Sequence, residues 1–323
     1  MAELITARVP IGVSACIGRC PVRYNGRAMD SLSVLGRERA DFALTPVCPE
    51  CLAGLGVPRE PIHLTGTGAD VLARRARVLD RHGRDVTDAL VAGARAAIDA
   101  LERAGAVAFI AREASPSCGI ARARVGRRRT EKRGAGVFGA LLLERDLFLV
   151  PDDALASPLR WWDARRRLHA WLWLRERVVE RSRDLYDAWH VVKFIVQETD
   201  RPAADEIGRH LAALAKNASA AQLEESKRAI LEALKRPSST PRIRSAMFKT
   251  YVHAKKRGRL AGVDLHDLSF DSPEVRLNAD RLAAELVKLE RISFENDLLF
   301  GTSPVIRRDP RRLRGEAPPA ADH

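Results

Sequence analysis

Three cysteines in the first half of the chain each follow a short apolar segment of strand length. The segments are Ile5 to Val13, Phe42 to Val47 and Val107 to Ile110, and the cysteines after them are Cys16, Cys48 and Cys118. Short apolar runs that end in loop residues are typical of buried strands. The sequence therefore predicts three strands, each of which delivers one thiol near its C-terminal end.

Helical segments alternate with these strands along the chain. Asp85 to Ala104 has apolar residues at helical spacing, and a second predicted helix at Gly136 to Glu144 precedes a strand at Leu147 to Val150. This alternation favours a mainly parallel sheet flanked by helices, so we predict an α/β domain over residues 1–155. In open sheets of this kind ligands bind at the carboxyl ends of the strands, where the three cysteines fall.

The second half of the chain has a different composition. Glycine becomes rare after Ser157, and long stretches rich in Arg, Glu, Ala and Leu predict an all-α domain over residues 156–307. We expect one long helix with Leu168 to Val192 along a single stripe, and further helices at 203–216, 219–235, 241–257 and 272–291. Ser219 and Gln222 form a predicted capping box. The tail over 308–323 is predicted to be disordered.

Cysteine usage and the N-terminal segment indicate the compartment. The chain has 323 residues and five cysteines, all of them before residue 119. Met1 to Val13 lacks the features of a secretory signal, and no apolar run reaches the ~20 residues that a bilayer crossing needs. We therefore expect a cytoplasmic protein without membrane spans. Metal or redox chemistry is then a better explanation of the cysteines than a disulfide framework.

The chain is strongly basic, with a formal charge of +13. Such a charge is compatible with anionic partners such as nucleotides or nucleic acid, although a composition rich in arginine also raises it without any partner. The stretch Arg122 to Arg133 closely follows Cys118 and carries seven basic residues against one acid, Glu131. It is either a contact for a nucleotide phosphate or RNA backbone, or a solvated surface loop.

Three thiolates are suited to an iron-sulfur cluster that keeps one iron open. A cubane has four iron positions, so three cysteines leave one iron for water or substrate. An open iron is what a Lewis-acid or sulfur-abstracting catalyst needs. The alternative is that the cysteines are ordinary buried residues, because free cysteine packs well as a small apolar side chain.

The motifs around the three cysteines resemble those of the thiouracil desulfidase family. They include Ser14-Ala15-Cys16 with Val22-Arg23-Tyr24, Val47-Cys48-Pro49-Glu50 with Pro58-Arg59-Glu60-Pro61, and Ser115-Pro116-Ser117-Cys118-Gly119. Gly83-Arg84-Asp85-Val86-Thr87 and Gly136-Val137-Phe138 continue the similarity in the same order as in that family. The resemblance covers roughly residues 9 to 150. The helical half is faintly similar to a second domain, of unknown function, that often follows the desulfidase domain.

This resemblance implies a cofactor and a reaction. In the family, cysteines that correspond to Cys16, Cys48 and Cys118 hold a 4Fe-4S cluster whose fourth iron has no protein ligand. The implied substrate is a small thiolated pyrimidine base, nucleoside or nucleotide, such as 2-thiouracil. Its sulfur binds the open iron, water attacks the carbon, and the sulfur leaves as sulfide without net redox change. A soft iron favours sulfur over competing oxygen ligands.

Several polar residues within the shared motifs are candidates for the site. Glu50 is the first candidate for the base that activates water, and Ser115 and Ser117 are candidate hydrogen-bond donors. The predicted contacts to substrate are Ser14, Arg23, Asn25 and Arg59. The family more often has Asp at the position of Asn25, which weakens any acid-base role there. The alternatives are a salt bridge from Glu50 to Arg23 or Arg59, and loop capping by the serines.

The sequence does not assign a role to two further cysteines, and it allows two alternative functions. Cys20 and Cys51 lie close in sequence to Cys16 and Cys48, and each is a bystander, a fourth ligand or a sulfur acceptor. The first alternative function is an iron-sulfur sensor or nucleic-acid-binding accessory protein without turnover. The second is an inactive domain kept as a scaffold for the helical half. The oligomeric state and the natural substrate do not follow from the sequence.

Overall fold

The computed structural model describes residues 3–126, 133–243 and 303–307, together with single positions between 245 and 287. The described chain divides into two compact units. One unit is Arg8–Ala156, and the other combines the N-terminal residues up to Ala7 with the chain from Ser157 onward. The predicted helices at 241–257 and 272–291 fall mostly outside the described residues, and the tail at 308–323 lies entirely outside them.

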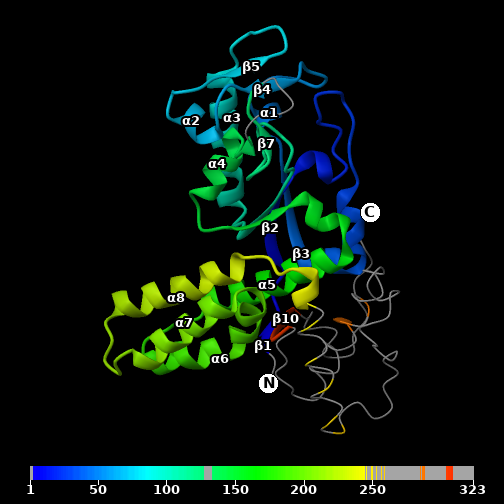
Figure 1. The fold of residues 1–323 in the computed structure, drawn as a ribbon. Coiled ribbons are helices and arrows are strands. Elements are labelled where there is room, and N and C mark those ends of the chain that lie inside the picture. The colour runs from blue at the N-terminus through cyan, green and yellow to red at the C-terminus, as the bar shows by residue number, and fades with distance from the viewer. Residues whose placement is uncertain are drawn as a thin grey trace. The chain divides into compact units, whose positions relative to one another are not determined.

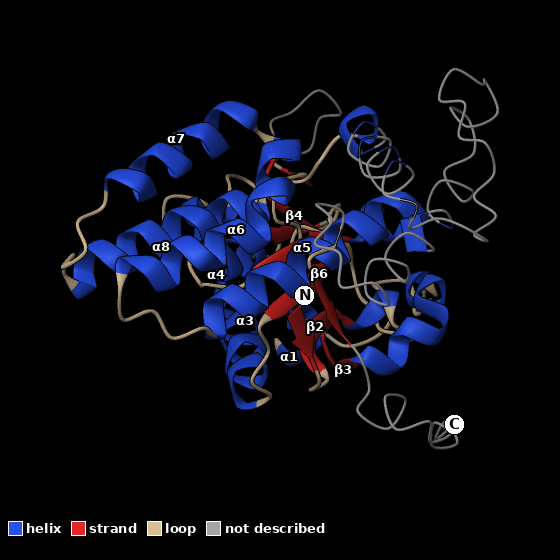
Figure 2. Ribbon diagram, turned by 90° about the horizontal axis from the view of Figure 1, so that it is seen from below, coloured by secondary structure: helices blue, strands red, loops and turns tan. Residues whose placement is uncertain are grey.

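A four-stranded parallel sheet with the order β3-β2-β6-β9 is the centre of the Arg8–Ala156 unit. The strands are β2 (Val9–Ser14), β3 (Phe42–Val47), β6 (Ala108–Ala111) and β9 (Phe148–Pro151). Figure 2 shows β2, β3 and β6 side by side. Because Ser14 is in register with Val47, the segments that follow β2 and β3 leave the sheet at the same edge. The predicted α/β fold with a mainly parallel sheet is confirmed.

Helices and short strands surround this sheet (Figure 1). The helices are α1 (Pro49–Leu52), α2 (Gly68–Leu72), α3 (Thr87–Arg103) and α4 (Val137–Leu143), with 3-10 segments η1 (Ala15–Ile17), η2 (Ser31–Asp41) and η3 (Asp152–Ala156). Two small antiparallel pairs are β4 (Ile62–Leu64) with β5 (Val78–Asp80), and β7 (Ala123–Arg124) with β8 (Arg133–Gly134). The apolar stripe of α3 packs into a buried core with Phe109 and Phe138, whose rings meet edge to face at 5.2 Å.

The predicted strand at Ile5 to Val13 is wrong in its first half. The chain forms two strands there. The first, β1 (Glu3–Ile5), pairs in parallel with β10 (Val305–Arg307). Both belong to the unit formed by Met1–Ala7 and the chain from Ser157 onward, which we call the helical unit. Three residues without large apolar side chains, Thr6, Ala7 and Arg8, interrupt the apolar run before β2 begins. Arg8 instead donates a hydrogen bond of 2.6 Å to the carbonyl oxygen of Phe42, which fixes the start of the sheet.

The helical unit contains α5 (Pro158–Glu176), α6 (Ser182–Thr199), α7 (Arg201–Ala213) and α8 (Ala220–Lys235). The capping box of Ser219 and Gln222 is present at the start of α8. No helix among the described residues is long and apolar enough to cross a membrane.

The single long helix predicted through Leu168 to Val192 is wrong, because α5 and α6 are separate helices. Arg177 has an extended backbone that ends α5. Lys227 on α8 donates hydrogen bonds of 2.9 Å to the carbonyl oxygens of Arg175 and Arg177, and so satisfies acceptors that the break exposes. The apolar stripe of the sequence does not reveal this break, because α5 and α6 both bury apolar residues of that stripe, such as Leu168 and Val192.

A buried network of charges holds the helical unit together. Arg166 is fully buried, donates to Asp163 at 2.7 Å, and also forms an ion pair with Glu198 on α6. Its guanidinium lies 4.3 Å from the ring centre of Trp162. Arg167 pairs with Asp163 at 2.9 Å and donates to the last carbonyl oxygens of α8. Two cations therefore neutralise two buried carboxylates.

Replacing Arg166 by methionine is expected to destabilise this unit by about 3–5 kcal/mol, because Glu198 and Asp163 stay buried without their main cation. Urea unfolding followed by tryptophan fluorescence measures the effect, since all five tryptophans lie between Trp161 and Trp189. Arg183→Met is the matched control, because its pair with Asp187 at 3.7 Å is exposed. The control should lose no more than about 1 kcal/mol. Equal losses in both variants would contradict this account.

Candidate iron-sulfur and catalytic site

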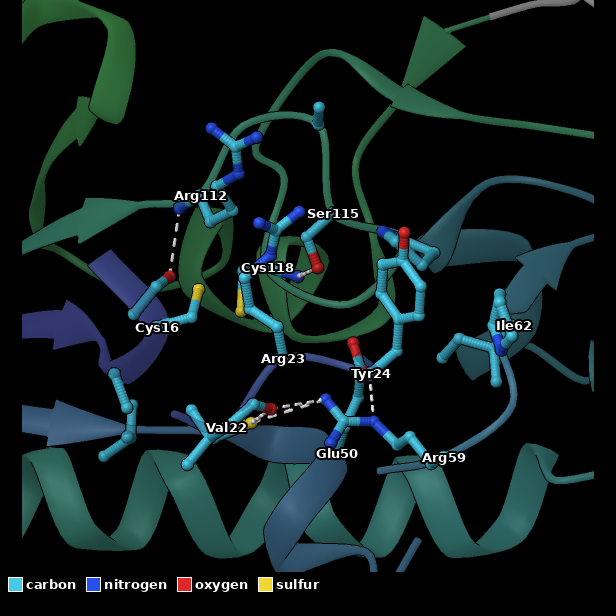
Figure 3. A pocket seen from close by; sticks show the side chains of 17 residues that line it. Cys16, Val22, Arg23, Tyr24, Glu50, Arg59, Ile62, Arg112, Ser115 and Cys118 are labelled. Carbon is cyan, nitrogen blue, oxygen red and sulfur yellow. Dashed lines mark hydrogen bonds and ion pairs between the residues drawn. The ribbon is translucent and has the colours of Figure 1, made fainter. Parts of the chain in front are cut away.

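A cavity of about 200 Å³ lies at the carboxyl end of the parallel sheet (Figure 3). Its lining comes from five separate parts of the Arg8–Ala156 unit: Ser14, Ala15, Cys16, Val22, Arg23, Tyr24, Val47, Cys48, Glu50, Arg59, Pro61, Ile62, Arg112, Ala114, Ser115, Pro116 and Cys118. The three cysteines singled out by the sequence thus line one cavity, although they are far apart along the chain. Figure 3 shows the sulfur atoms of Cys16 and Cys118 directed toward the same space.

Each cysteine is positioned by a different local structure. Cys16 lies in η1, directly after β2. Cys48 is the N-cap residue of α1, and Pro49 occupies the first helical position, where its missing N–H costs nothing. Cys118 is buried in the long loop between β6 and β7. All five cysteines are free thiols.

The loop that carries Cys118 is fixed by polar side chains inside it. The hydroxyl of Ser115 accepts hydrogen bonds of 3.1 Å from the backbone N–H groups of Ser117 and Cys118. The buried carboxylate of Glu113 accepts three more, from the N–H groups of Ile120, Ala121 and Arg122 at 2.5 to 3.2 Å. These bonds leave the loop little freedom to reorient the Cys118 thiol.

Helix α4 fixes the same loop from the other side. The N–H groups of Val137 and Phe138 in its first turn donate to the carbonyl oxygens of Pro116 and Ser117, at 3.2 and 2.9 Å. No side chain caps this helix, so the loop carbonyls take the place of a cap. A Cβ atom at Gly139 would collide with the carbonyl oxygen of Gly119. Glycine is therefore required where the helix meets the loop.

Gly139→Ala is expected to destabilise the Arg8–Ala156 unit by about 2–3 kcal/mol, because two backbones must move apart to admit the methyl group. The far-ultraviolet circular dichroism transition should shift to lower temperature. The tryptophan fluorescence transition should not shift, since this unit contains no tryptophan. Gly18→Ala is the control, because its Cβ would lie no closer than 3.4 Å to any neighbour. A shift of the fluorescence transition alone would rule out the proposed collision.

Burial dominates the electrostatics of the three thiols. It raises the pKa of Cys16, and the nearby positive charges of Arg112 and Arg23 oppose this rise. It raises the pKa of Cys48 to about 12. Burial also raises the pKa of Cys118 well above its usual range, against the effect of a hydrogen bond with Ser14. The three thiols interact electrostatically, since Cys16 and Cys48 both contribute to the rise in the pKa of Cys118.

Glu50 faces the cavity with both carboxylate oxygens engaged. Its Oε2 accepts from Nε of Arg59 at 2.6 Å, and its Oε1 accepts from the hydroxyl of Ser117 at 2.7 Å. Arg59 also donates to the carbonyl oxygen of Val22 at 2.9 Å. The ion pair with Arg59 that the sequence left as an alternative is thus present. It does not remove Glu50 from the cavity, because the carboxylate remains part of the lining.

Some of the other predicted residues line the cavity, and others do not. Ser14, Arg23 and Ser115 line the cavity, whereas the fully buried Ser117 reaches it only through Glu50. Asn25 is exposed and outside the lining, and its side chain accepts from the N–H of Arg27 at 3.2 Å. Of the basic stretch that begins at Arg122, residues 127–132 lie outside the described chain, and Arg122 itself pairs with Asp153 at 2.8 Å.

Two lining residues with polar side chains, Arg112 and Tyr24, were not predicted from the sequence as site residues. Arg112 follows β6, its guanidinium pairs with Asp152 at 2.6 Å, and its N–H donates to the hydroxyl of Ser14 at 3.0 Å. Tyr24 lies between Arg23 and the predicted Asn25; the residue is 43% exposed and lines the cavity. The position of Arg112 at the carboxyl end of a predicted strand was a usable signal for the first of these.

Within the described residues, no three His, Cys, Asp or Glu side chains lie close enough to bind a single metal ion. The chemistry of the donors still fits a cluster, because each thiolate of a cluster binds a different iron, and the ligands of a cluster stand further apart than those of one ion. Cys20 and Cys51 do not line the cavity that the other three share. The residues present therefore fit a cluster with three thiol ligands from this cavity.

The comparisons with known proteins match this unit. A family model described as 2-thiouracil desulfurase matches residues 11–154. YbbK, an uncharacterised protein of Bacillus subtilis (strain 168), is 35% identical over 148 residues, which cover 44% of this chain and 95% of YbbK. A solved structure titled as the 4Fe-4S-dependent thiouracil desulfidase TudS is 31% identical, covers 46% of this chain and 93% of its own, and has a TM-score of 0.39. The chain belongs to the 2-thiouracil desulfurase family through its Arg8–Ala156 unit, which confirms the resemblance seen in its motifs.

Proposed function

We propose that the Arg8–Ala156 unit removes sulfur from a thiolated pyrimidine base, nucleoside or nucleotide with the help of a 4Fe-4S cluster held by Cys16, Cys48 and Cys118. The convergence of these three thiols and Glu50 on one cavity is the observation that carries this proposal. Membership of the 2-thiouracil desulfurase family supports the substrate class. The similar desulfidase TudS is described as 4Fe-4S-dependent, and we extend that dependence to this chain as part of the same proposal.

The three cysteines would act as ligands of the cluster, and the cluster would provide the site at which the substrate sulfur binds. When bound, a cluster with one iron free of protein ligands provides a soft Lewis acid that polarises a C=S bond. The thiolates of Cys16, Cys48 and Cys118 would hold such a cluster. Arg112 and Arg23, whose charges oppose the rise in the pKa of Cys16 that burial causes, place positive charge beside the thiolates that would bind the cluster.

Glu50 acts as the general base for water in this proposal. Arg59 and Ser117 hold its two oxygens at 2.6 and 2.7 Å, so the carboxylate keeps one orientation while it accepts a proton. The proton is then returned to the departing sulfur. The balance is one thiocarbonyl and one water converted into one carbonyl and one hydrogen sulfide, with no electrons gained or lost.

The remaining lining residues position the substrate. The exposed ring of Tyr24 offers a flat apolar face for a pyrimidine, with the guanidinium of Arg23 5.9 Å from its centre. The hydroxyls of Ser14 and Ser115 are engaged in backbone hydrogen bonds, so we assign them the shaping of the Cys16 and Cys118 loops. Asn25 lies outside the lining, so it would contact only a substrate that extends beyond the cavity.

Anaerobic reconstitution of the full chain with iron and sulfide tests the function. The loaded protein should bleach the near-ultraviolet absorbance of 2-thiouracil, 4-thiouracil or their nucleosides and release one sulfide per base. Iron binding without turnover on any member of this panel, together with salt-dependent RNA binding, would favour the sensor or accessory function instead.

A further inference from the structure

A second thiol stands beside Cys48 in a sequence pattern that the proposed reaction does not use. Cys48-Pro49-Glu50-Cys51 is a Cys-x-x-Cys motif at the start of α1, directly after a parallel strand. Cys48 is the N-cap, and Cys51 is the third residue of the helix. This spacing next to a parallel sheet is typical of redox-active dithiols.

The contacts of Cys48 and Cys51 place the two sulfur atoms in one environment. Both lie 4.0 Å from the same acceptor, the carbonyl oxygen of Val22. The guanidinium of Arg59 spans them, with Nη1 3.9 Å from the sulfur of Cys51 and Nη2 4.0 Å from that of Cys48. The Arg59 side chain is only 5% exposed, so this cation is held in place beside both thiols.

Cys51 differs from the other thiols near the site. It does not line the cavity shared by Cys16, Cys48 and Cys118, yet its sulfur has the same two neighbours as the sulfur of Cys48, the carbonyl oxygen of Val22 and the guanidinium of Arg59. Cys20, the remaining thiol, also lies outside the cavity, and its sulfur is 4.0 Å from the carbonyl oxygen of Gly18. Cys51 is therefore the thiol placed to react with a cluster ligand without being one.

We propose that Cys48 and Cys51 form a disulfide when no cluster is bound, and that low-molecular-weight disulfides are the oxidants. One protein thiol attacks the small disulfide, which releases one small thiol and leaves a mixed disulfide on the protein. The second protein thiol then attacks that sulfur, the Cys48–Cys51 bond forms, and the second small thiol leaves. Two protein thiols are oxidised, one small disulfide is reduced, and no other reactant is needed.

This closure has a consequence for the site, because it consumes Cys48. The oxidised chain should not accept a cluster until a reductant reopens the pair. Closure of the pair does not depend on the proposed function, whereas the block on iron uptake rests on it. The two readouts therefore separate a failure of this inference from a failure of the proposed function.

Peptide mapping of the full chain tests the disulfide directly. The chain is stripped of iron with a chelator, equilibrated with oxidised glutathione, alkylated with iodoacetamide and digested with trypsin. Cleavage after Arg39 and Arg59 yields a peptide of residues 40–59 that contains Cys48 and Cys51 and no other cysteine. In the wild type and in Cys20→Ser this peptide should lose both alkylation sites, and dithiothreitol should restore them. In Cys51→Ser it should carry one glutathione on Cys48 instead.

Three results would overturn the inference. The first is a wild-type peptide that takes up two alkyl groups after oxidation. The second is a disulfide from Cys48 to Cys16 or Cys118. The third concerns the protein loaded with iron. There, iodoacetamide should modify Cys51, whereas the cluster should protect Cys48. Protection of both thiols would show that Cys51 is a ligand. Iron uptake by the oxidised wild type should be lost and should return after reduction; uptake that oxidation leaves unchanged would overturn the predicted block.

Discussion

Cys48→Ser is expected to abolish both iron uptake and desulfuration by the reconstituted chain. Serine has nearly the same shape as cysteine but is a poor ligand for iron in a sulfur-rich site, so the change removes one of three ligands with little effect on packing. Iron and sulfide analysis after anaerobic reconstitution measures the first effect, and sulfide release from 2-thiouracil measures the second. We expect the brown colour of the loaded protein to be absent in this variant.

Cys20→Ser is the matched control for this experiment. Cys20 lies four residues after Cys16 and outside the cavity, so its replacement should leave iron content and turnover unchanged. Full iron content in Cys48→Ser would show that Cys48 is not a ligand. Equal losses in both variants would point to a general sensitivity of this region rather than to ligation.

Glu50→Gln is expected to lower kcat by about 10²–10⁴-fold while iron content stays at the wild-type level. Glutamine keeps the size of the side chain and one oxygen to accept from Ser117, but it cannot take a proton from water. Steady-state assays on the reconstituted protein, normalised to iron, give the ratio. Glu60→Gln is the control, since Glu60 pairs with Arg81 at 2.6 Å outside the cavity.

The same variant also tests the structural alternative for Glu50. If its ion pair with Arg59 serves only to hold the fold, Glu50→Gln should lower the melting temperature and the iron content together. In that case the residual iron-containing protein would turn over at the wild-type rate per iron. That pattern would remove Glu50 from the proposed mechanism.

The sequence alone predicts the parts of the site that lie at the ends of strands. The strand at Phe42 to Val47 has the predicted bounds, and Ser14 is in register with Val47, so the loops of Cys16 and Cys48 begin at one edge. The apolar runs are sufficient here because β2 is buried along most of its length and β3 buries Phe42 and Val47 at its two ends. The prediction that Cys16, Cys48 and Cys118 gather at one edge depends only on this topology.

Long-range polar contacts could not be predicted in the same way. Arg112 takes its place in the cavity through Asp152, forty positions further on, and Glu113 fixes the Cys118 loop through backbone groups that carry no sequence signal. Asn25 shows the converse, because a residue inside a shared motif turns away and binds its own loop. Membership of the shared motifs therefore located the cavity, whereas the other side chains around it required the fold.

The breaks in regular structure were also hidden from periodicity. The break between α5 and α6 depends on Lys227, which donates hydrogen bonds to the carbonyl oxygens of Arg175 and Arg177 at the end of α5. The separation of β1 from β2 depends on pairing with β10, three hundred residues away. Both features arise from partners distant in sequence, which local patterns of apolar residues do not record.

A crystal structure of the anaerobically reconstituted full chain tests the central claim most directly. We expect one 4Fe-4S cluster bound by the sulfur atoms of Cys16, Cys48 and Cys118, with one iron that has no protein ligand and faces the cavity beside Glu50. A protein side chain on that iron, from Cys51 or any other residue, would contradict the account, and so would iron bound away from these three thiols.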